Sequence, residues 1–178
     1  MGPKKEDPKE VRVLNRVLRW TDKGIASEAD PRHVEIICNQ LQLESCKPMS
    51  SPGTREEGTT KDDHEDLFTG EKASLYRALA ARCNYLSTDR PDIAYATKEL
   101  ARCMSSPTKG SWDKLKKMGR YLQGHPRLTS WVKWQGANPS LQIYTDADWA
   151  GCKLTRKSTS GGCVMRGSHL IKSWAKIR

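Results

Sequence analysis

Residues 144–152 read YTDADWAGC, and residues 157–162 read KSTSGG. The segment 141–146 alternates between apolar and polar side chains, which predicts a β-strand that ends near Asp146. Side chains two positions apart lie on one face of a strand, so the carboxylates of Asp146 and Asp148 would share a face. Carboxylate oxygens are ligands that Mg²⁺ prefers. Asp146 is therefore a candidate catalytic group and metal ligand, and Asp148 is a second candidate ligand, although two turn-capping aspartates would give the same pattern.

Two further short strands are predicted at 163–165 and 170–174, with a turn at 166–168 between them. Three strands without covering helices would leave an apolar sheet face and an open edge. We therefore expect this region to be poorly ordered or prone to aggregation by itself.

The first residues of the chain predict disorder followed by a hairpin. Residues 1–9 are charged and contain two prolines, a composition typical of disordered segments. The apolar residues of 11–20 recur at a helical spacing, but the segment is rich in Val and runs into a turn signal at 21–24. A β-hairpin is therefore favoured over a helix, with a short second strand at 25–28.

A helix and a linker are predicted next. Asp30 as N-cap and Pro31 in the first helical position predict a helix over 33–43. Residues 54–66 read TREEGTTKDDHED and contain no apolar residue, which predicts an acidic linker over 54–70.

The middle of the chain predicts three amphipathic helices. Each shows apolar or small side chains at steps of three and four, the spacing of one helix face. These faces are predicted to form the core, and they comprise Leu75, Leu79, Cys83 and Leu86; Ile93, Thr97, Leu100 and Met104; and Trp112, Leu115, Gly119 and Leu122.

The charge is unevenly distributed along the chain. The net charge is +10, but residues 1–70 hold 11 Lys/Arg and 14 Asp/Glu, whereas residues 71–178 hold 20 Lys/Arg and 7 Asp/Glu. A segment this basic is typical of nucleic-acid-binding proteins. A row of cations on the third helix could follow a phosphate backbone, although a plain solvated face is the alternative. The candidate nucleic-acid-binding residues are Lys109, Lys114, Lys116, Lys117 and Arg120.

Several classes of protein do not fit the sequence. The six Cys and four His show no zinc-ligand spacing. No apolar stretch follows Met1, so neither a signal peptide nor a membrane contact is expected, and an intracellular location in cytoplasm or nucleus is the default.

The motifs resemble a known family. Residues 144–152 and 157–162, with LIKSW at 170–174, closely resemble the start of the ribonuclease H domain of copia-type long-terminal-repeat retrotransposons. Earlier segments agree in the right order. They are CKP at 46–48, YRALAARCNYL at 76–86, TDRPDIAYA at 88–96, which carries an inserted Asp89, and RYLQG at 120–124.

The resemblance implies an α+β arrangement taken from the Pol polyprotein, with the C-terminal part of the reverse transcriptase before the start of ribonuclease H. It would comprise the disordered residues 1–9, the end of the palm hairpin with the first thumb helix (10–53), the acidic linker (54–70), the basic helical thumb and connection (71–135), and the first three strands of a truncated ribonuclease H-like fold (136–178). Asp146 would be the first metal-binding carboxylate, with Mg²⁺ as cofactor, whereas Asp148 matches a position that is not usually a ligand.

The departures from the family limit the expected activity. The Tyr-x-Asp-Asp motif of the polymerase does not occur in the chain, and no acid follows Asp148 to supply the later ribonuclease H ligands. We therefore expect a fragment that contributes template–primer binding, holds Mg²⁺ weakly or not at all, and is inactive alone. The expected partners are an RNA–DNA or DNA duplex and the missing remainder of the polyprotein. The alternative is a non-catalytic, basic nucleic-acid-binding protein derived from a retroelement.

Overall fold

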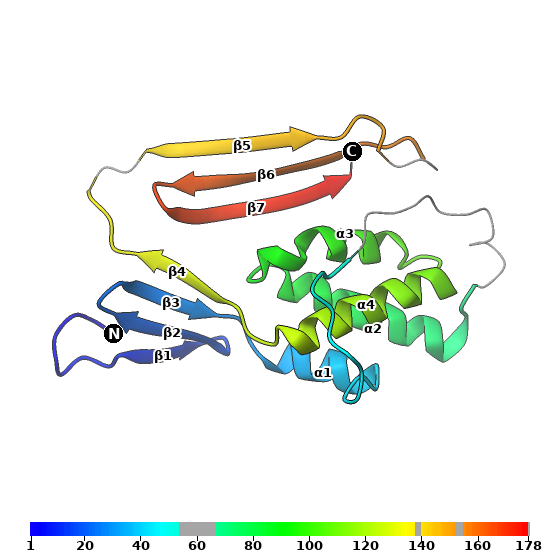
Figure 1. The fold of residues 1–178 in the computed structure, drawn as a ribbon, viewed down its shortest axis with the longest axis horizontal. Coiled ribbons are helices and arrows are strands. Elements are labelled where there is room, and N and C mark those ends of the chain that lie inside the picture. Colours follow the sequence, from blue (N-terminus) through cyan, green and yellow to red (C-terminus); the bar gives the residue numbers. More distant parts are fainter. Residues whose placement is uncertain (54–66, 138–139, 152–154, 178) are drawn as a thin grey trace.

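The chain folds into a helical block and two antiparallel sheets (Figure 1). The structure is a computed structural model, and it describes residues 1–53, 67–137, 140–151 and 155–177. The α+β class expected from the sequence is therefore confirmed. Within the described residues, no helix combines the length and apolar character needed to cross a membrane.

The N-terminal sheet begins with three strands in sequence order, β1 (Glu10–Val13), β2 (Arg16–Thr21) and β3 (Gly24–Glu28). Leu14 and Asn15 join the first two strands and have φ values of 50° and 63°. Positive φ at both central residues is the conformation of a two-residue hairpin turn. The prediction of a hairpin rather than a helix is confirmed, and the segment 11–20 contains a turn of its own that the sequence analysis did not anticipate.

A fourth strand, β4 (Thr129–Lys133), joins this sheet by pairing with β3. Trp131 lies opposite Ala26, and Lys133 lies opposite Gly24. The backbone at Val132 and Lys133 approaches Gly24 so closely that a Cβ there would clash with it, and Gly24 has a φ of 145°. The basic region 71–135 thus ends in a strand of the N-terminal sheet, a pairing not expected from the sequence.

The helical block contains α1 (Arg32–Gln40), α2 (Gly70–Leu86), the short 3₁₀ helix η2 (Pro91–Ile93), α3 (Ala94–Arg102) and α4 (Lys109–Gly124). All four predicted helices are present, with small shifts of their bounds. At the first of them Pro31, rather than Asp30, is the N-cap. The Asp30 carboxylate instead accepts the backbone N–H of Arg32 at 3.0 Å.

One core joins α1 to the later helices. Ile37, Leu79, Leu100 and Leu122 are among its most buried side chains. Tyr76 is also fully buried, and its hydroxyl donates to the carbonyl of Leu100 at 2.8 Å. The predicted stripes therefore do form the core. α1 therefore packs against α2 and α4 in this core.

The second sheet contains β5 (Leu141–Ala147), β6 (Thr159–Arg166) and β7 (His169–Ile177), paired antiparallel in that order. The three predicted strands are confirmed, and each extends beyond its predicted bounds. β7 lies beside α3 and contacts it (Figure 1). The Lys98 ammonium donates to the Thr159 hydroxyl at 2.9 Å. Every residue of β5 is exposed.

Residues 1–9 were expected to be disordered, and residues 54–70 were expected to form a linker. In residues 1–9, where disorder was expected, the backbone N–H of Lys4 donates to Asp7 at 2.9 Å and the Lys9 ammonium donates to the carbonyl of Gly2 at 2.9 Å. Most of the predicted acidic linker, residues 54–66, lies outside the described residues. Its last part is described, and there Leu67 forms an isolated bridge with Thr108.

Candidate functional site

Asp146 lies near the end of β5, which is an edge strand of the second sheet. It pairs with Gly161 of β6, and its side chain is exposed. Its carboxylate accepts the backbone N–H of the adjacent Ala147 at 2.9 Å. Among the described residues this carboxylate therefore has only a local partner, which leaves it able to meet a ligand.

Asp148 lies just past the end of β5 and has a different role. Its carboxylate accepts the backbone N–H of Thr159, and its own N–H donates to the carbonyl of Thr159 at 3.0 Å. Gly151 lies so close that a Cβ there would clash with the Asp148 carboxylate. These contacts match the turn-capping interpretation, because they close the loop between β5 and β6.

Both carboxylates line one open cleft of about 560 Å³ between α3 and the second sheet. Asp92 lines it as well, but its carboxylate is hydrogen-bonded to Arg90 and Tyr121. Within the part of the chain that the structure describes, no three Cys, His, Asp or Glu residues lie close enough together to hold a metal ion. Asp146 offers an exposed carboxylate, and Asp148 offers a second one of which Oδ1 is already hydrogen-bonded to the backbone of Thr159.

Arg90 and Asp92 form an ion pair that the sequence pattern did not predict. Arg90 is 1% exposed, and its guanidinium also donates to the carbonyl of His125 at 3.0 Å. Burial raises the pKa of Asp92, but the hydrogen bonds from Arg90 and Tyr121 outweigh it, so the pKa lies below its ordinary value. The RPD and RYLQG segments, quoted above only for their resemblance, contain this cluster.

The five predicted nucleic-acid-binding residues all lie on α4 but not on one face. Lys109 and Lys116 are exposed, and Asp113 is exposed between them at helical spacing. The Arg120 guanidinium donates to the carbonyl of Lys47 at 2.7 Å, which fixes the chain after α1. Asp113 therefore interrupts the expected row of cations, and the guanidinium of Arg120 is partly occupied by its hydrogen bond to the carbonyl of Lys47.

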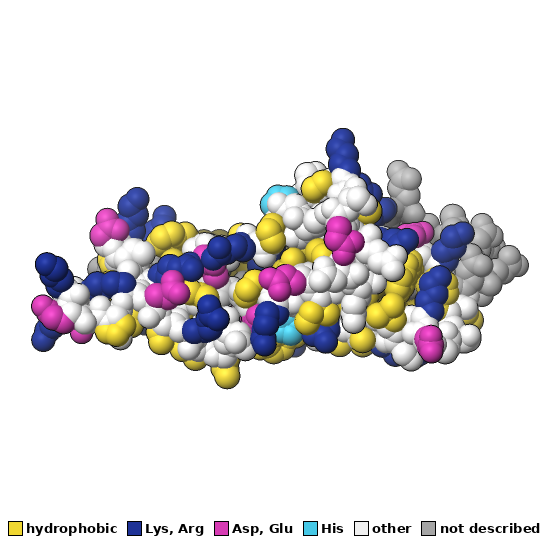
Figure 2. Space-filling view, turned by 90° about the horizontal axis from the view of Figure 1, so that it is seen from below, with side chains coloured by type: hydrophobic (Ala, Val, Ile, Leu, Met, Phe, Trp, Pro, Cys, Tyr) yellow, Lys and Arg dark blue, Asp and Glu magenta, His cyan; other side chains and the backbone are white. Residues whose placement is uncertain are grey.

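Basic and acidic side chains are also interspersed over a wider surface of the molecule. Figure 2 shows Lys and Arg side chains distributed along one face of the molecule, with Asp and Glu side chains among them. This face does not carry a single continuous basic tract.

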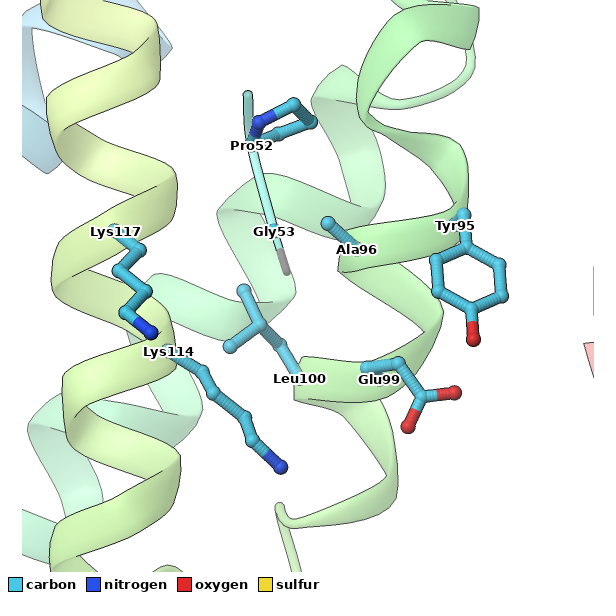
Figure 3. A pocket seen from close by; sticks show the side chains of 8 residues that line it. All are labelled: Pro52, Gly53, Tyr95, Ala96, Glu99, Leu100, Lys114 and Lys117. Carbon is cyan, nitrogen blue, oxygen red and sulfur yellow. The ribbon is translucent and has the colours of Figure 1, made fainter. Parts of the chain in front are cut away.

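Lys114 and Lys117 lie on an adjacent side of α4, where they line a small hollow of about 40 Å³ together with α3 and residues 52–53. Figure 3 shows both side chains extending from α4 into the gap between the two helices, where Leu100 also projects. Tyr95 and Glu99 lie on the far side of α3.

The geometry is that of a mixed α+β chain with a carboxylate cleft beside basic helices, and comparison with known proteins identifies its family. The chain is 41% identical to the retrovirus-related Pol polyprotein from transposon RE2 and 33% identical to that from transposon RE1, both of Arabidopsis thaliana. Each match covers 81% of this chain and 10% of the polyprotein. It is also 32% identical to the uncharacterized mitochondrial protein AtMg00810 of the same plant, over 83% of this chain and 59% of that protein.

The chain therefore belongs to the retrovirus-related Pol polyproteins of copia-type transposons. It spans about a tenth of the polyproteins and about three fifths of the mitochondrial protein. No family model matches the chain, and no solved structure matches it significantly.

Proposed function

We propose that this chain contributes to template–primer binding within a retroelement polymerase, with the end of a reverse-transcriptase palm and its thumb and connection preceding the start of a ribonuclease H-like fold. The observation that carries the proposal is the basic helical region 71–135, which holds 13 Lys/Arg and 5 Asp/Glu. Lys109 and Lys116 on α4 are exposed, which supports a contact with phosphates.

The salt dependence of duplex binding tests this proposal. When binding rests on phosphate contacts, the logarithm of the association constant falls linearly with the logarithm of the salt concentration. The slope of this line is about −0.9 for each phosphate of a duplex that the protein neutralises. Lys109→Gln combined with Lys116→Gln should therefore weaken binding to an RNA–DNA hybrid and lower the slope by about 1.8. Lys4→Gln with Lys5→Gln removes the same charge from the N-terminal turn and should leave the slope unchanged. Equal changes of the slope in the two double variants would refute the assignment of Lys109 and Lys116 to the duplex-binding face.

The carboxylate cleft leads to a second, narrower proposal about catalysis. We infer that Asp146 binds Mg²⁺ weakly and that the 178-residue chain does not cleave an RNA–DNA hybrid, since two-metal hydrolysis needs several ligands around two ions. Mg²⁺-dependent cutting by this chain, lost in Asp146→Asn, would overturn that inference.

The two candidate functions are a polymerase segment and a non-catalytic nucleic-acid-binding protein. The exposed apolar residues on the second sheet, including Leu141 at 65% and Ile143 at 62%, support the first, because a partner from the rest of the polyprotein would cover them. Mixing the chain with that remainder and measuring whether Ile143 becomes protected from solvent distinguishes the two. No protection would favour the stand-alone binding protein.

A further inference from the structure

The outer edge of β5 carries no partner strand. β5 pairs with β6 along one side, and among the described residues no strand pairs with its other side, which forms a border of the molecule (Figure 1). Every residue of β5 is exposed, and Ile143 and Tyr144 at its centre are 62% and 56% exposed. An exposed edge of this kind is a template for pairing with another strand.

Two hydrogen bonds show which backbone groups of β5 face this edge. The carbonyl of Ser140 accepts the N–H of Gly167 at 2.9 Å, and the N–H of Asp148 donates to the carbonyl of Thr159 at 3.0 Å. Successive residues of an antiparallel strand turn their backbone groups alternately toward and away from a given neighbour. The even-numbered residues therefore face β6, and the odd-numbered residues point their backbone groups at the outer edge. The latter are Leu141, Ile143, Thr145 and Ala147.

The sequence of β5 complements itself when a second copy runs antiparallel to it. A register centred on Tyr144 uses the whole strand, and it places Ile143 of one copy opposite Thr145 of the other, as a pair that exchanges backbone hydrogen bonds. The same register places Gln142 opposite Asp146. The Tyr144 hydroxyl donates to Oε1 of Gln142 at 3.0 Å, which leaves the amide NH₂ of Gln142 to donate to that carboxylate. Because Asp146 is the only charged residue of β5, no like charges face each other.

We propose that two copies of the chain pair through the outer edges of β5 and so join their second sheets into one continuous sheet. α3 contacts β7, at the opposite edge of the sheet, and therefore leaves room for a second copy beside β5 (Figure 1). A contact between two edge strands is small, so the dimer should be weak, with a dissociation constant in the micromolar range. The inference goes beyond nucleic-acid binding and does not depend on it.

Sedimentation of the natural chain over a series of concentrations measures the dimer. Added salt should strengthen it, because each copy carries a net charge of +10 that repels the other. Copies bridged by bound nucleic acid would instead separate as salt rises, and that result would overturn the pairing. A chain that stays monomeric at about 200 µM, far above a micromolar dissociation constant, would overturn it as well.

Thr145→Pro tests the edge itself. Proline removes one N–H that faces outward and is tolerated on an edge strand at such a position, so β5 should keep its pairing with β6. The variant should be monomeric at every concentration, with a urea midpoint close to that of the natural chain.

Gln142→Glu tests the register without changing the backbone. It places a carboxylate opposite Asp146 at two symmetry-related positions, and the dimer should weaken about tenfold. Gln142→Glu combined with Asp146→Lys places opposite charges there and should restore the dimer. Gln42→Glu adds the same charge at an exposed position after α1 and should change nothing.

Hydrogen exchange at single amides provides a second reading of the same contact. As the concentration rises, the amides of Ile143 and Thr145 should exchange more slowly, whereas the amide of Tyr144, which faces β6, should be unchanged. A dimer that forms without this alternation, or that persists in both Thr145→Pro and Gln142→Glu, would place the interface elsewhere and overturn the proposal.

Discussion

The guanidinium of Arg90 contacts the carboxylate of Asp92 through two nitrogens, Nη2 at 2.7 Å and Nε at 3.0 Å from its oxygens. The Tyr121 hydroxyl donates to the same carboxylate at 2.8 Å, and Arg90 also reaches the carbonyl of His125. This cluster connects η2, just before α3, to the end of α4.

Removing Arg90 should destabilise the fold strongly. Arg90→Ala leaves Asp92 without its ionic partner at a largely buried position, and we expect a loss of about 3 kcal/mol in the free energy of unfolding. Urea denaturation measures it. Arg90→Lys should recover only part of the loss, because an ammonium cannot make the bidentate contact. A loss below about 1 kcal/mol in Arg90→Ala would mean that the cluster is not a principal contact of the fold.

The same cluster predicts a dependence of stability on pH. Hydrogen bonds from Arg90 and Tyr121 hold the pKa of Asp92 below its ordinary value despite burial. A group with a lowered folded pKa stabilises the protein above its unfolded pKa, near pH 4, and that contribution disappears as the pH falls through the folded pKa. The urea concentration at the unfolding midpoint should therefore decrease as the pH is lowered below about 4. Asp92→Asn should be less stable at neutral pH and show a shallower acid dependence, and an unchanged acid profile would assign that dependence to other carboxylates.

Two threonines at helix N-termini allow a matched test of capping. The Thr108 hydroxyl accepts the backbone N–H of Ser111 in a capping box at the start of α4, whereas Thr69, the N-cap of α2, makes no such side-chain contact. Thr108→Ala should cost about 1 kcal/mol of unfolding free energy, and Thr69→Ala should cost much less. Thermal or urea unfolding measures both. Equal losses would show that the hydrogen bond to Ser111 contributes nothing measurable.

The exposed apolar side of the second sheet predicts aggregation. Ile143 is 62% exposed on β5, at the edge of the sheet. Ile143→Lys should delay aggregation on warming, measured by light scattering, with little change in the unfolding midpoint. Thr145→Lys adds the same charge to the same face without removing an apolar side chain, and it should help less. If both variants delay aggregation equally, the charge and not the apolar surface is responsible.

Local patterns in the sequence predicted the helices and the second sheet well. The stripe through Leu79, Cys83 and Leu86 is a helical repeat, and those residues are buried in the core. The alternation before Asp146 is a strand repeat, and that strand is present as β5. Both signals depend only on neighbours within a few positions, which a single sequence contains.

Contacts between distant parts of the chain could not be predicted in the same way. Pairing of β4 with β3 joins residues more than one hundred positions apart, and nothing in the local sequence of β4 specifies this partner. The contact of Arg120 with the carbonyl of Lys47 is equally remote, so a residue predicted to bind phosphate proved to hold the chain after α1. The role of Asp148 likewise depends on Thr159, which lies in the next strand.

Binding of an RNA–DNA hybrid by the natural chain across a range of salt concentrations tests the central claim most directly. We predict measurable binding, with a steep negative slope of the logarithm of the association constant against the logarithm of the salt concentration. The magnitude of this slope should decrease by about 1.8 when Lys109 and Lys116 are replaced together by Gln. Absence of binding at low salt, or binding with no dependence on salt, would contradict the assignment of this chain to template–primer binding.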